Sequence, residues 1–226
     1  MLPASPISID ANQTSCDKLH MKNLIRSAWM TLLCLLVAAV VSSCADCPKI
    51  GELYFIGDSI IARWDLDECF PCYTTHNIGV GGSGVDYIES LAGTQTGHTV
   101  VVLSGTNNLD VMTDNLPKID AYAQRFVDAV VALDASRVFV ISILPRELTQ
   151  DEKLLPTICR LNEDLALLTA DHPDITIVDA YDDFMRGATI DYELFTDRLH
   201  LSDVGYERLS LILQRELDKL PQSDEI

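Results

Sequence analysis

Two distant segments of the chain contain the residue types that acyl transfer by a serine requires. Ser59 ends the segment Gly57-Asp-Ser59, which directly follows a short apolar run, and His200 lies near the other end of the chain with Asp197 three residues before it. Such chemistry needs a base that takes the hydroxyl proton and a carboxylate that holds the imidazole in the right tautomer. Each feature alone also has a plainer interpretation. Ser59 could cap the N-terminus of a helix, and the Asp-x-x-His pair could be ordinary polar residues on the surface.

Two further polar segments follow other apolar runs. The glycine-rich segment Asn77-Ile-Gly-Val-Gly-Gly-Ser-Gly84 would let a backbone N–H approach a ligand, and the amide of Asn107 in Ser104-Gly-Thr-Asn-Asn108 could donate to a developing oxyanion. The glycine spacing also fits a dinucleotide site, but the acidic residue that should follow the next strand is absent. Ile61 replaces the last glycine of a G-x-S-x-G elbow, which disfavours an ordinary α/β-hydrolase.

The segments between these motifs alternate between strand and helix patterns. Short β-branched apolar runs predict buried parallel strands, and residues recurring at three- and four-residue steps predict amphipathic helices. We expect strands at 52–56, 73–78, 99–103, 137–143 and 175–178, and helices at 59–64, 85–91, 116–133, 151–170 and 202–220. This alternation predicts a three-layer α/β/α sandwich with a five-stranded parallel sheet, whose ligands bind at the carboxyl ends of the strands.

Taken in order, the motifs resemble the SGNH hydrolase superfamily, the GDSL-type esterases and lipases, and most of all its small acetylhydrolase-like branch. The resemblance rests on Phe-Ile-Gly-Asp-Ser, Asn-x-Gly-x-Gly-Gly, Gly-Thr-Asn-Asn, a Leu-Pro-Arg after the fourth strand, and Asp-x-x-His, and it runs from about residue 54 to residue 206. Two positions depart from the family pattern. Ile60 replaces the Leu of the GDSL name, and Ser83 stands where many relatives have Asp.

The resemblance implies roles for five residues. Ser59 would be the nucleophile, His200 the base and later the acid, and Asp197 the carboxylate that orients the imidazole. The backbone N–H groups of Ser59 and Gly82 and the side-chain amide of Asn107 would form the oxyanion hole.

The resemblance also implies a flavodoxin-like fold and hydrolysis of carboxylic esters without a metal or an organic cofactor. Short loops at the sheet edge and the lack of a separate lid domain favour short acyl groups, acetyl above all, on a carbohydrate or a similar small substrate. Two alternatives remain. One is lysophospholipase or thioesterase activity on longer acyl chains, and the other is a non-catalytic surface binding lipoprotein of the same fold.

The charge of the chain argues against nucleic acid as a partner. The 226 residues include 16 Lys and Arg against 34 Asp and Glu, a formal net charge of -18, and 48% of the residues are hydrophobic. Such a chain can bury a core, but it repels phosphate backbones and lacks the basic stripe that would neutralise them. We therefore expect an ester substrate and a membrane reached through a lipid anchor rather than through surface charge.

The beginning of the chain predicts export. Residues 28–41 are apolar apart from one Thr, basic residues precede them, and Val41-Ser-Ser-Cys44 is similar to a bacterial lipobox. We predict an overlong start at 1–20, a lipoprotein signal peptide at 21–43 with lipidation of Cys44, and a tether at 44–50. The hydrolase domain would span 51–220, with a tail at 221–226. An uncleaved membrane anchor is the alternative, and either way the domain is extracytoplasmic.

Four cysteines follow Cys44 in the expected mature chain. They are Cys47, Cys69, Cys72 and Cys159, and the sequence does not choose among their three possible pairings. In an oxidising compartment an even number favours disulfides. A zinc or redox pair at Cys69 and Cys72 is a weaker interpretation, because no second Cys/His pair follows at finger spacing.

Overall fold

The computed structural model describes residues 47–147 and 153–220. Within it a compact unit begins at Pro48. The predicted start segment 1–20, the signal peptide 21–43 and Cys44 lie outside the described residues, so these assignments and the exact domain limits remain predictions. In the described ranges no helix is both long enough and apolar enough to cross a membrane.

Five parallel strands form the main sheet, as the sequence predicted. They are β1 (Glu52–Gly57), β2 (Thr74–Asn77), β3 (Thr99–Leu103), β4 (Arg137–Ile141) and β5 (Ile175–Val178), and their order across the sheet is β2-β1-β3-β4-β5. This is the flavodoxin-like strand order, in which the chain changes direction next to β1. Tyr54 pairs with His76 on one side and with Val100 on the other, so β1 is a central strand.

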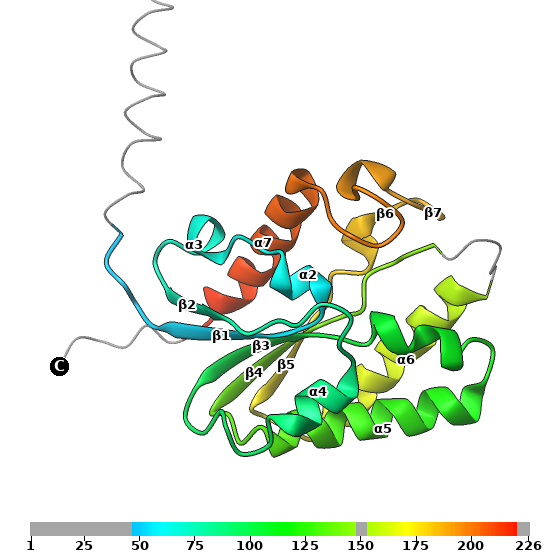
Figure 1. Ribbon diagram of the computed structural model, residues 1–226, viewed down its shortest axis with the longest axis horizontal. Helices are drawn as coiled ribbons and strands as arrows, with labels where there is room; N and C mark the ends of the chain where they lie inside the picture. The colour runs from blue at the N-terminus through cyan, green and yellow to red at the C-terminus, as the bar shows by residue number, and fades with distance from the viewer. Residues whose placement is uncertain (1–46, 148–152, 221–226) are drawn as a thin grey trace, which may run out of the picture. The chain divides into compact units, whose positions relative to one another are not determined.

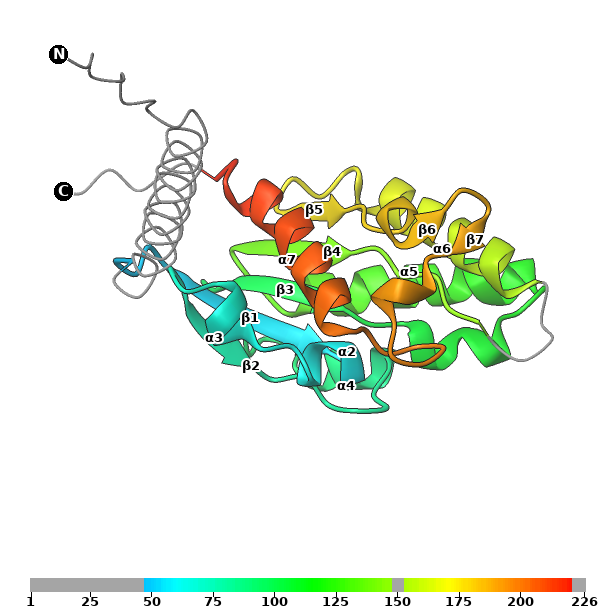
Figure 2. The same cartoon turned by 90° about the horizontal axis from the view of Figure 1, so that it is seen from above.

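Helices cover both faces of the sheet and complete the predicted three-layer sandwich. The α-helices are α2 (Ser59–Ala62), α3 (Leu66–Cys69), α4 (Val85–Ser90), α5 (Leu116–Ala132), α6 (Leu154–Thr169) and α7 (Asp203–Leu217). Figure 1 shows α2, α3 and α7 on one face and α4, α5 and α6 on the other. The view from above in Figure 2 shows α7 lying across the sheet.

The two faces of the sheet bury separate hydrophobic clusters. Val101 and Leu103 of β3 contribute to the cluster under α7, whereas Val100 and Val102 contribute to the cluster under α5 and α6. Successive side chains of a strand point to opposite faces, so both faces of this central strand must be apolar. The near-continuous apolar runs in the sequence are the consequence.

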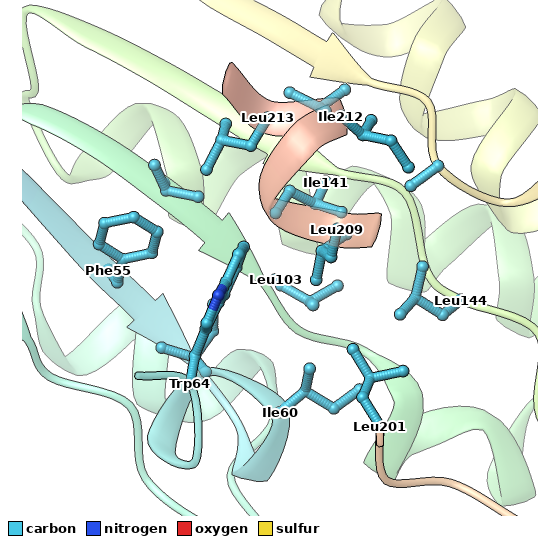
Figure 3. Packing of buried hydrophobic residues seen from close by; sticks show 14 of the residues in the cluster. Phe55, Ile60, Trp64, Leu103, Ile141, Leu144, Leu201, Leu209, Ile212 and Leu213 are labelled. Carbon is cyan, nitrogen blue, oxygen red and sulfur yellow. The ribbon is translucent and has the colours of Figure 1, made fainter. Parts of the chain in front are cut away.

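Trp64 anchors the segment after β1, which carries Ser59, to α7. Its ring packs edge-on against Phe55 with a centroid separation of 5.5 Å, and its indole Nε1 donates to Ser210 Oγ at 3.0 Å. Figure 3 shows both rings beside Leu209 and Leu213 of α7. Burying one such large apolar side chain contributes about 1.5–3 kcal/mol, so this contact firmly attaches the segment after β1 to the core.

The structure contains several short elements that the sequence patterns did not predict. Besides α3, they are the 3₁₀ helices η2 (Thr106–Val111), η3 (Asp182–Phe184) and η4 (Tyr192–Leu194), and the antiparallel pair β6 (Met185–Arg186) and β7 (Thr189–Ile190). β4 also ends at Ile141, two residues earlier than predicted. Such short pieces span too few residues for a period to appear, and tertiary contacts decide them.

The cysteines divide into two groups. Cys47 and Cys72 are disulfide-bonded, whereas Cys69 and Cys159 are free thiols. A disulfide-bonded Cys72 has no thiolate to offer a metal, so the weaker interpretation of Cys69 and Cys72 as a zinc or redox pair was wrong.

Candidate active site

The carboxyl ends of the strands bring the sequence motifs together. Ser59 begins α2 directly after β1, Gly82 lies in the loop after β2, and Asn107 lies in η2 after β3. His200 lies in the loop that precedes α7. Because all five strands are parallel, these ends meet along the same edge of the sheet, where α/β folds of this kind bind ligands.

Ser59, His200 and Asp197 form a continuous chain of hydrogen bonds. Ser59 Oγ lies 3.0 Å from His200 Nε2, although the two residues are 141 positions apart in the sequence. His200 Nδ1 lies 2.7 Å from Asp197 Oδ2. Both distances fall within the range of real hydrogen bonds. With the Nδ1 proton held by the carboxylate, Nε2 is free to accept the proton of the serine hydroxyl.

The loop that carries Ser59 is buried and tightly packed. Asp58 is the N-cap of α2, and its Oδ1 accepts a hydrogen bond from Ile60 N at 2.9 Å. A Cβ atom added to Gly57 would lie 2.0 Å from Leu103 O, so only glycine lets β1 and β3 approach this closely. Ser59 itself is 9% exposed, enough for its hydroxyl to reach a substrate from a fixed position.

The loop that carries His200 is held mainly by Asp197. Asp197 Oδ1 accepts from the backbone N–H groups of both Leu199 and His200, each at 2.7 Å, and its other oxygen binds the imidazole. Thr196 N donates to His200 O at 2.8 Å and closes the turn. The side chain of Asp197 is 54% exposed and that of His200 is 18% exposed. Hydrogen bonds rather than burial therefore orient this half of the site.

The three predicted oxyanion donors lie on segments that contact one another: a Cβ atom on Gly81 would lie 3.9 Å from Ser59 Cβ, and Asn107 hydrogen-bonds to Ser83. Gly82 has a φ of +77°, a conformation that glycine adopts without strain, and a Cβ atom there would meet nothing within 4 Å. Within the described residues, the N–H groups of Ser59 and Gly82 donate to no other protein group. Asn107 uses one amide hydrogen on Ser83 O, at 2.8 Å, and keeps the other for a ligand.

Ser83 links the segments that carry these donors. Its Oγ donates to Gly57 O at 3.0 Å, and its carbonyl oxygen accepts from Asn107 Nδ2. The Ser83 hydroxyl therefore ties the glycine-rich loop to Gly57 at the end of β1. Asn108 has a structural role instead, because its Oδ1 accepts from Tyr122 OH at 3.0 Å and from Val85 N at 3.4 Å.

Two aspartates close to the site have opposite electrostatic environments. The hydrogen bonds from the side chain and the backbone of His200 lower the pKa of Asp197 to about 2, so it is a carboxylate at neutral pH. Burial raises the pKa of Asp58 to about 6, an effect that the Ile60 N–H, His200 and Arg146 partly oppose. Asp197 is thus suited to stabilise an imidazolium, whereas the charge of Asp58 is costly to bury.

The arrangement can perform nucleophilic acyl transfer with the groups already named. It supplies a hydroxyl, an imidazole within reach of that hydroxyl, a carboxylate behind the imidazole, and donors beside the nucleophile. In the described part of the chain no cluster of three or more His, Cys, Asp or Glu side chains is placed to hold a metal ion.

Comparison with known sequences agrees with this chemistry. The model of the GDSL-like Lipase/Acylhydrolase family matches residues 55–208, which include all of the residues above. The chain belongs to this family. No curated protein matches the sequence closely enough to count as a relative.

Solved structures of GDSL proteins share the fold. A member of the lipolytic G-D-S-L family from Veillonella parvula has a TM-score of 0.62 at 20% identity, with 75% of this chain and 100% of that chain covered. A GDSL-like lipase from Bacteroides thetaiotaomicron has a TM-score of 0.60 at 17% identity, with coverages of 80% and 95%. The acetylxylan esterase Axe2 from Geobacillus stearothermophilus has a TM-score of 0.56 at 16% identity, with coverages of 79% and 100%.

Two residues of this GDSL-family protein were not assigned a functional role from the sequence. Ser83 was noted only as a departure from the family pattern, and Arg146 only as part of the Leu-Pro-Arg segment. The signal for Arg146 is its place, since the segment that follows the buried strand β4 (Arg137–Ile141) lies at the same sheet edge as the other motifs. For Ser83 no sequence signal exists, because its role depends on which backbone carbonyl lies opposite its hydroxyl.

Proposed function

We propose that this GDSL-family protein is a serine ester hydrolase that works through an acyl-serine intermediate. The observation that carries the proposal is the hydrogen-bonded chain from Ser59 Oγ through His200 to Asp197, with distances of 3.0 and 2.7 Å. Membership of an acylhydrolase family supports a hydrolase of this kind. The catalytic roles of the three residues are the part that experiment must establish.

In the first half of the reaction Ser59 Oγ attacks the ester carbonyl carbon. His200 Nε2 takes the hydroxyl proton, and Asp197 stabilises the imidazolium that results. The carbonyl oxygen becomes an oxyanion facing the N–H groups of Ser59 and Gly82 and the free amide hydrogen of Asn107. When the ester C–O bond breaks, His200 gives the proton to the departing alcohol.

In the second half a water molecule replaces the alcohol. His200 takes a proton from the water as its oxygen attacks the acyl carbon of the acyl-serine, and the same donors hold the second oxyanion. The bond between Ser59 Oγ and the acyl carbon then breaks, and the proton returns to Ser59 Oγ. The products are a carboxylic acid and the free enzyme, and His200 acts as base and then as acid in each half of the reaction.

Short acyl groups, such as acetyl on a carbohydrate or similar small molecule, are the proposed substrates. We call residues 57–59 the nucleophile loop. The hollow beside this loop has a volume of only about 10 Å³, and residues such as Ile60 and Leu199 line it. A larger hollow of about 480 Å³ lies beside Cys159 and Tyr181, on the face of β5, and does not include the triad. Neither hollow is lined by Ser59, and what supports short acyl groups is the shortness of the loops that follow β1, β2 and β3 at this sheet edge. The similar Axe2 structure is named an acetylxylan esterase and shares the fold only.

We further propose that the domain is anchored outside the cytoplasm through lipidated Cys44. Two observations support this proposal: the small-small-Cys segment after an apolar run, and the disulfide-bonded state of Cys47 and Cys72, since disulfides persist in oxidising compartments. Mass spectrometry of the N-terminal peptide should find a lipid-modified Cys44. Cys44→Ala should release the protein from the membrane fraction, and retention of this variant would contradict the lipid anchor.

The nucleophile is tested by replacing Ser59 with alanine. We expect Ser59→Ala to abolish hydrolysis of p-nitrophenyl acetate and labelling by a fluorophosphonate probe, while Tm stays close to that of the native protein. Ser90→Ala changes an exposed serine at the end of α4, away from the triad, and serves as the comparison for the labelling experiment. Labelling of the Ser59→Ala protein would refute the assignment of Ser59 as the nucleophile. A native protein that the probe does not label would favour the binding-protein alternative.

The acyl specificity is tested with nitrophenyl esters from acetate to palmitate. We expect kcat/KM to be highest for acetate and to fall steadily with chain length. A preference for chains longer than octanoate would instead favour the lysophospholipase or thioesterase alternative, and acetylated oligosaccharides would then be poor substrates.

A further inference from the structure

A small hollow beneath the nucleophile loop gathers polar atoms that the protein leaves unpaired. Its lining includes Asp58, Ser104 and Arg146, which are 1%, 2% and 7% exposed. In the described part of the chain, only five buried side-chain polar atoms have no hydrogen-bond partner. Three of them belong to these residues: Asp58 Oδ2, Ser104 Oγ and Arg146 Nε. Unpaired buried polar atoms are costly, so their concentration around one hollow indicates a shared partner.

One water molecule matches the hollow in size and in chemistry. The volume of about 10 Å³ is at the lower limit of the roughly 10–15 Å³ that one water requires. A water could donate to the carboxylate of Asp58, accept from the N–H of Arg146 Nε, and use its remaining hydrogen or lone pair on Ser104 Oγ. Three partners are the usual number for a buried water.

Arg146 uses its other nitrogens to hold the loop that carries Asn107. Its Nη1 donates to Thr106 Oγ1 at 3.4 Å, and its Nη2 forms an ion pair with Asp110 Oδ1 at 2.9 Å. Both partners belong to η2, and Thr106 directly precedes Asn107. Across the hollow, Asp58 directly precedes Ser59 and caps α2 through Ile60 N.

The segment that carries Arg146 also contacts the histidine loop. Glu147 N donates to Arg198 O at 3.3 Å, two residues before His200. The short segment after β4 therefore contacts η2 and the histidine loop directly, and it faces the nucleophile loop across the hollow. No other charged side chain in the lining faces Asp58 from this side.

We infer that Arg146 is a positioning residue, which sets the place of Ser59 and Asn107 by holding Thr106 directly and Asp58 through one buried water molecule. Arg146 does not touch the reacting atoms. It acts on the residues that precede the nucleophile and the oxyanion donor, and so it sets the distance between the two. The inference rests on the proposed esterase function for its kinetic consequence, but the water and the contacts can be observed without it.

The electrostatics support this arrangement. Burial lowers the pKa of Arg146 and raises that of Asp58, while each charge favours the ionised form of the other. Two buried opposite charges that share a hydrogen-bonded water satisfy each other better than either does alone. A guanidinium suits the place because its planar fork can bind Asp110, Thr106 and the water at once, which the single ammonium group of lysine cannot do.

Kinetic comparison of Arg146→Met, Arg146→Lys and a matched control tests the inference. Arg146→Met keeps the length of the side chain but removes the charge and the donors. We expect its kcat on p-nitrophenyl acetate to fall about 10- to 100-fold with KM nearly unchanged, because misplacement of reacting groups by about 1 Å has effects of this size. Arg146→Lys should recover part of the loss. Arg160→Met, which removes a surface ion pair with Asp120 and Asp164, should leave kcat unchanged.

Two kinetic outcomes would overturn the inference. The first is a native kcat in Arg146→Met, and the second is a raised KM with an unchanged kcat, which would place Arg146 in contact with the substrate. If Arg146→Met fails to fold, Ser104→Ala takes its place, because it removes one partner of the water and is expected to lower kcat less. A shift of Ser104→Ala toward longer esters at unchanged kcat would show that the hollow takes the acyl group instead.

A crystal structure at high resolution separates failure of this inference from failure of the proposed function. We expect one ordered water within hydrogen-bond distance of Asp58 Oδ2, Ser104 Oγ and Arg146 Nε in the native protein, and a longer distance between Ser59 and Asn107 in Arg146→Met. A native structure with this water and no ester hydrolysis would overturn the proposed function only. A native structure without the water would overturn the bridging role of Arg146, whatever the activity.

Discussion

The nucleophile loop and the histidine loop reach the same hydrogen bond by different physical means. Asp58 and Ser59 lie in a buried segment between β1 and α2, held by close packing of Gly57 against Leu103 and by the helix cap. Asp197 and His200 lie in a more exposed turn, held by three hydrogen bonds to one carboxylate. The first loop is fixed by the core, and the second is fixed by its own polar groups.

The difference explains why the two aspartates titrate in opposite directions. Asp197 is hydrogen-bonded and solvated, so its charge is stabilised and its pKa is lowered to about 2. Asp58 is deeply buried, so its charge is costly and its pKa is raised to about 6. A mutation in the exposed loop should therefore change catalysis with little effect on folding. A mutation in the buried loop should change folding stability and its pH dependence as well.

The largest expected effect is that of Asp197→Asn. The asparagine Oδ1 can keep the two backbone hydrogen bonds, but its NH₂ would face His200 Nδ1 and force the ring proton onto Nε2. That tautomer cannot accept the Ser59 proton, so we expect kcat to fall by about 10⁴-fold, with little change in Tm. Steady-state assays at neutral pH measure the effect, and Asp128→Asn on the outer surface is the control. A fall of less than tenfold would show that the carboxylate does not orient the imidazole.

Asp58→Asn should change the pH dependence of stability rather than abolish activity. Burial raises the pKa of Asp58 in the folded protein to about 6, above the ordinary value of about 3.9 for an aspartate, so folding favours the protonated form. The native protein should lose stability from this group as pH rises from about 4 to about 6, by about 3 kcal/mol in the free energy of unfolding. Asparagine does not ionise and keeps the acceptor for Ile60 N, so the variant should lack this decline.

Urea unfolding of native protein and Asp58→Asn between pH 4 and pH 7 measures this difference. The stability of the variant relative to the native protein should rise across the interval and then level off. Parallel stability curves for native protein and Asp58→Asn would contradict the buried, costly charge of Asp58.

The smallest expected effect is that of Ser83→Ala. The change removes only the hydrogen bond from Ser83 Oγ to Gly57 O and leaves the carbonyl that accepts from Asn107. One hydrogen bond of this kind contributes about 1 kcal/mol, which corresponds to about a fivefold fall in kcat if the whole loss reaches the transition state. Ser90→Ala, which removes an exposed hydroxyl at the end of α4, is the control. An unchanged kcat would mean that packing alone holds the glycine loop.

The sequence predicted the sheet well because four of its strands are apolar and largely β-branched runs, a pattern that shows even in four to six residues. These runs marked β1, β3, β4 and β5, the segment 73–78 before the glycine cluster marked β2, and the helical patterns marked α5, α6 and α7. The elements it did not predict, α3 and the 3₁₀ helices, span three to six residues and depend on contacts made elsewhere. The candidate triad and oxyanion donors were predicted because each lies in a short motif at a strand end or before the last helix.

The amino-acid sequence alone therefore indicated the local chemistry through four motifs: a serine at a helix start, a glycine loop, an asparagine and an Asp-x-x-His pair. Only the folded chain decided that Ser59 Oγ faces His200 Nε2 at 3.0 Å and that Ser83 bonds Gly57 O. Only folding placed Arg146 across a water-sized hollow from Asp58. The reason is that strand patterns and caps depend on neighbours along the chain, whereas these contacts join segments that meet only when a parallel sheet aligns its strand ends.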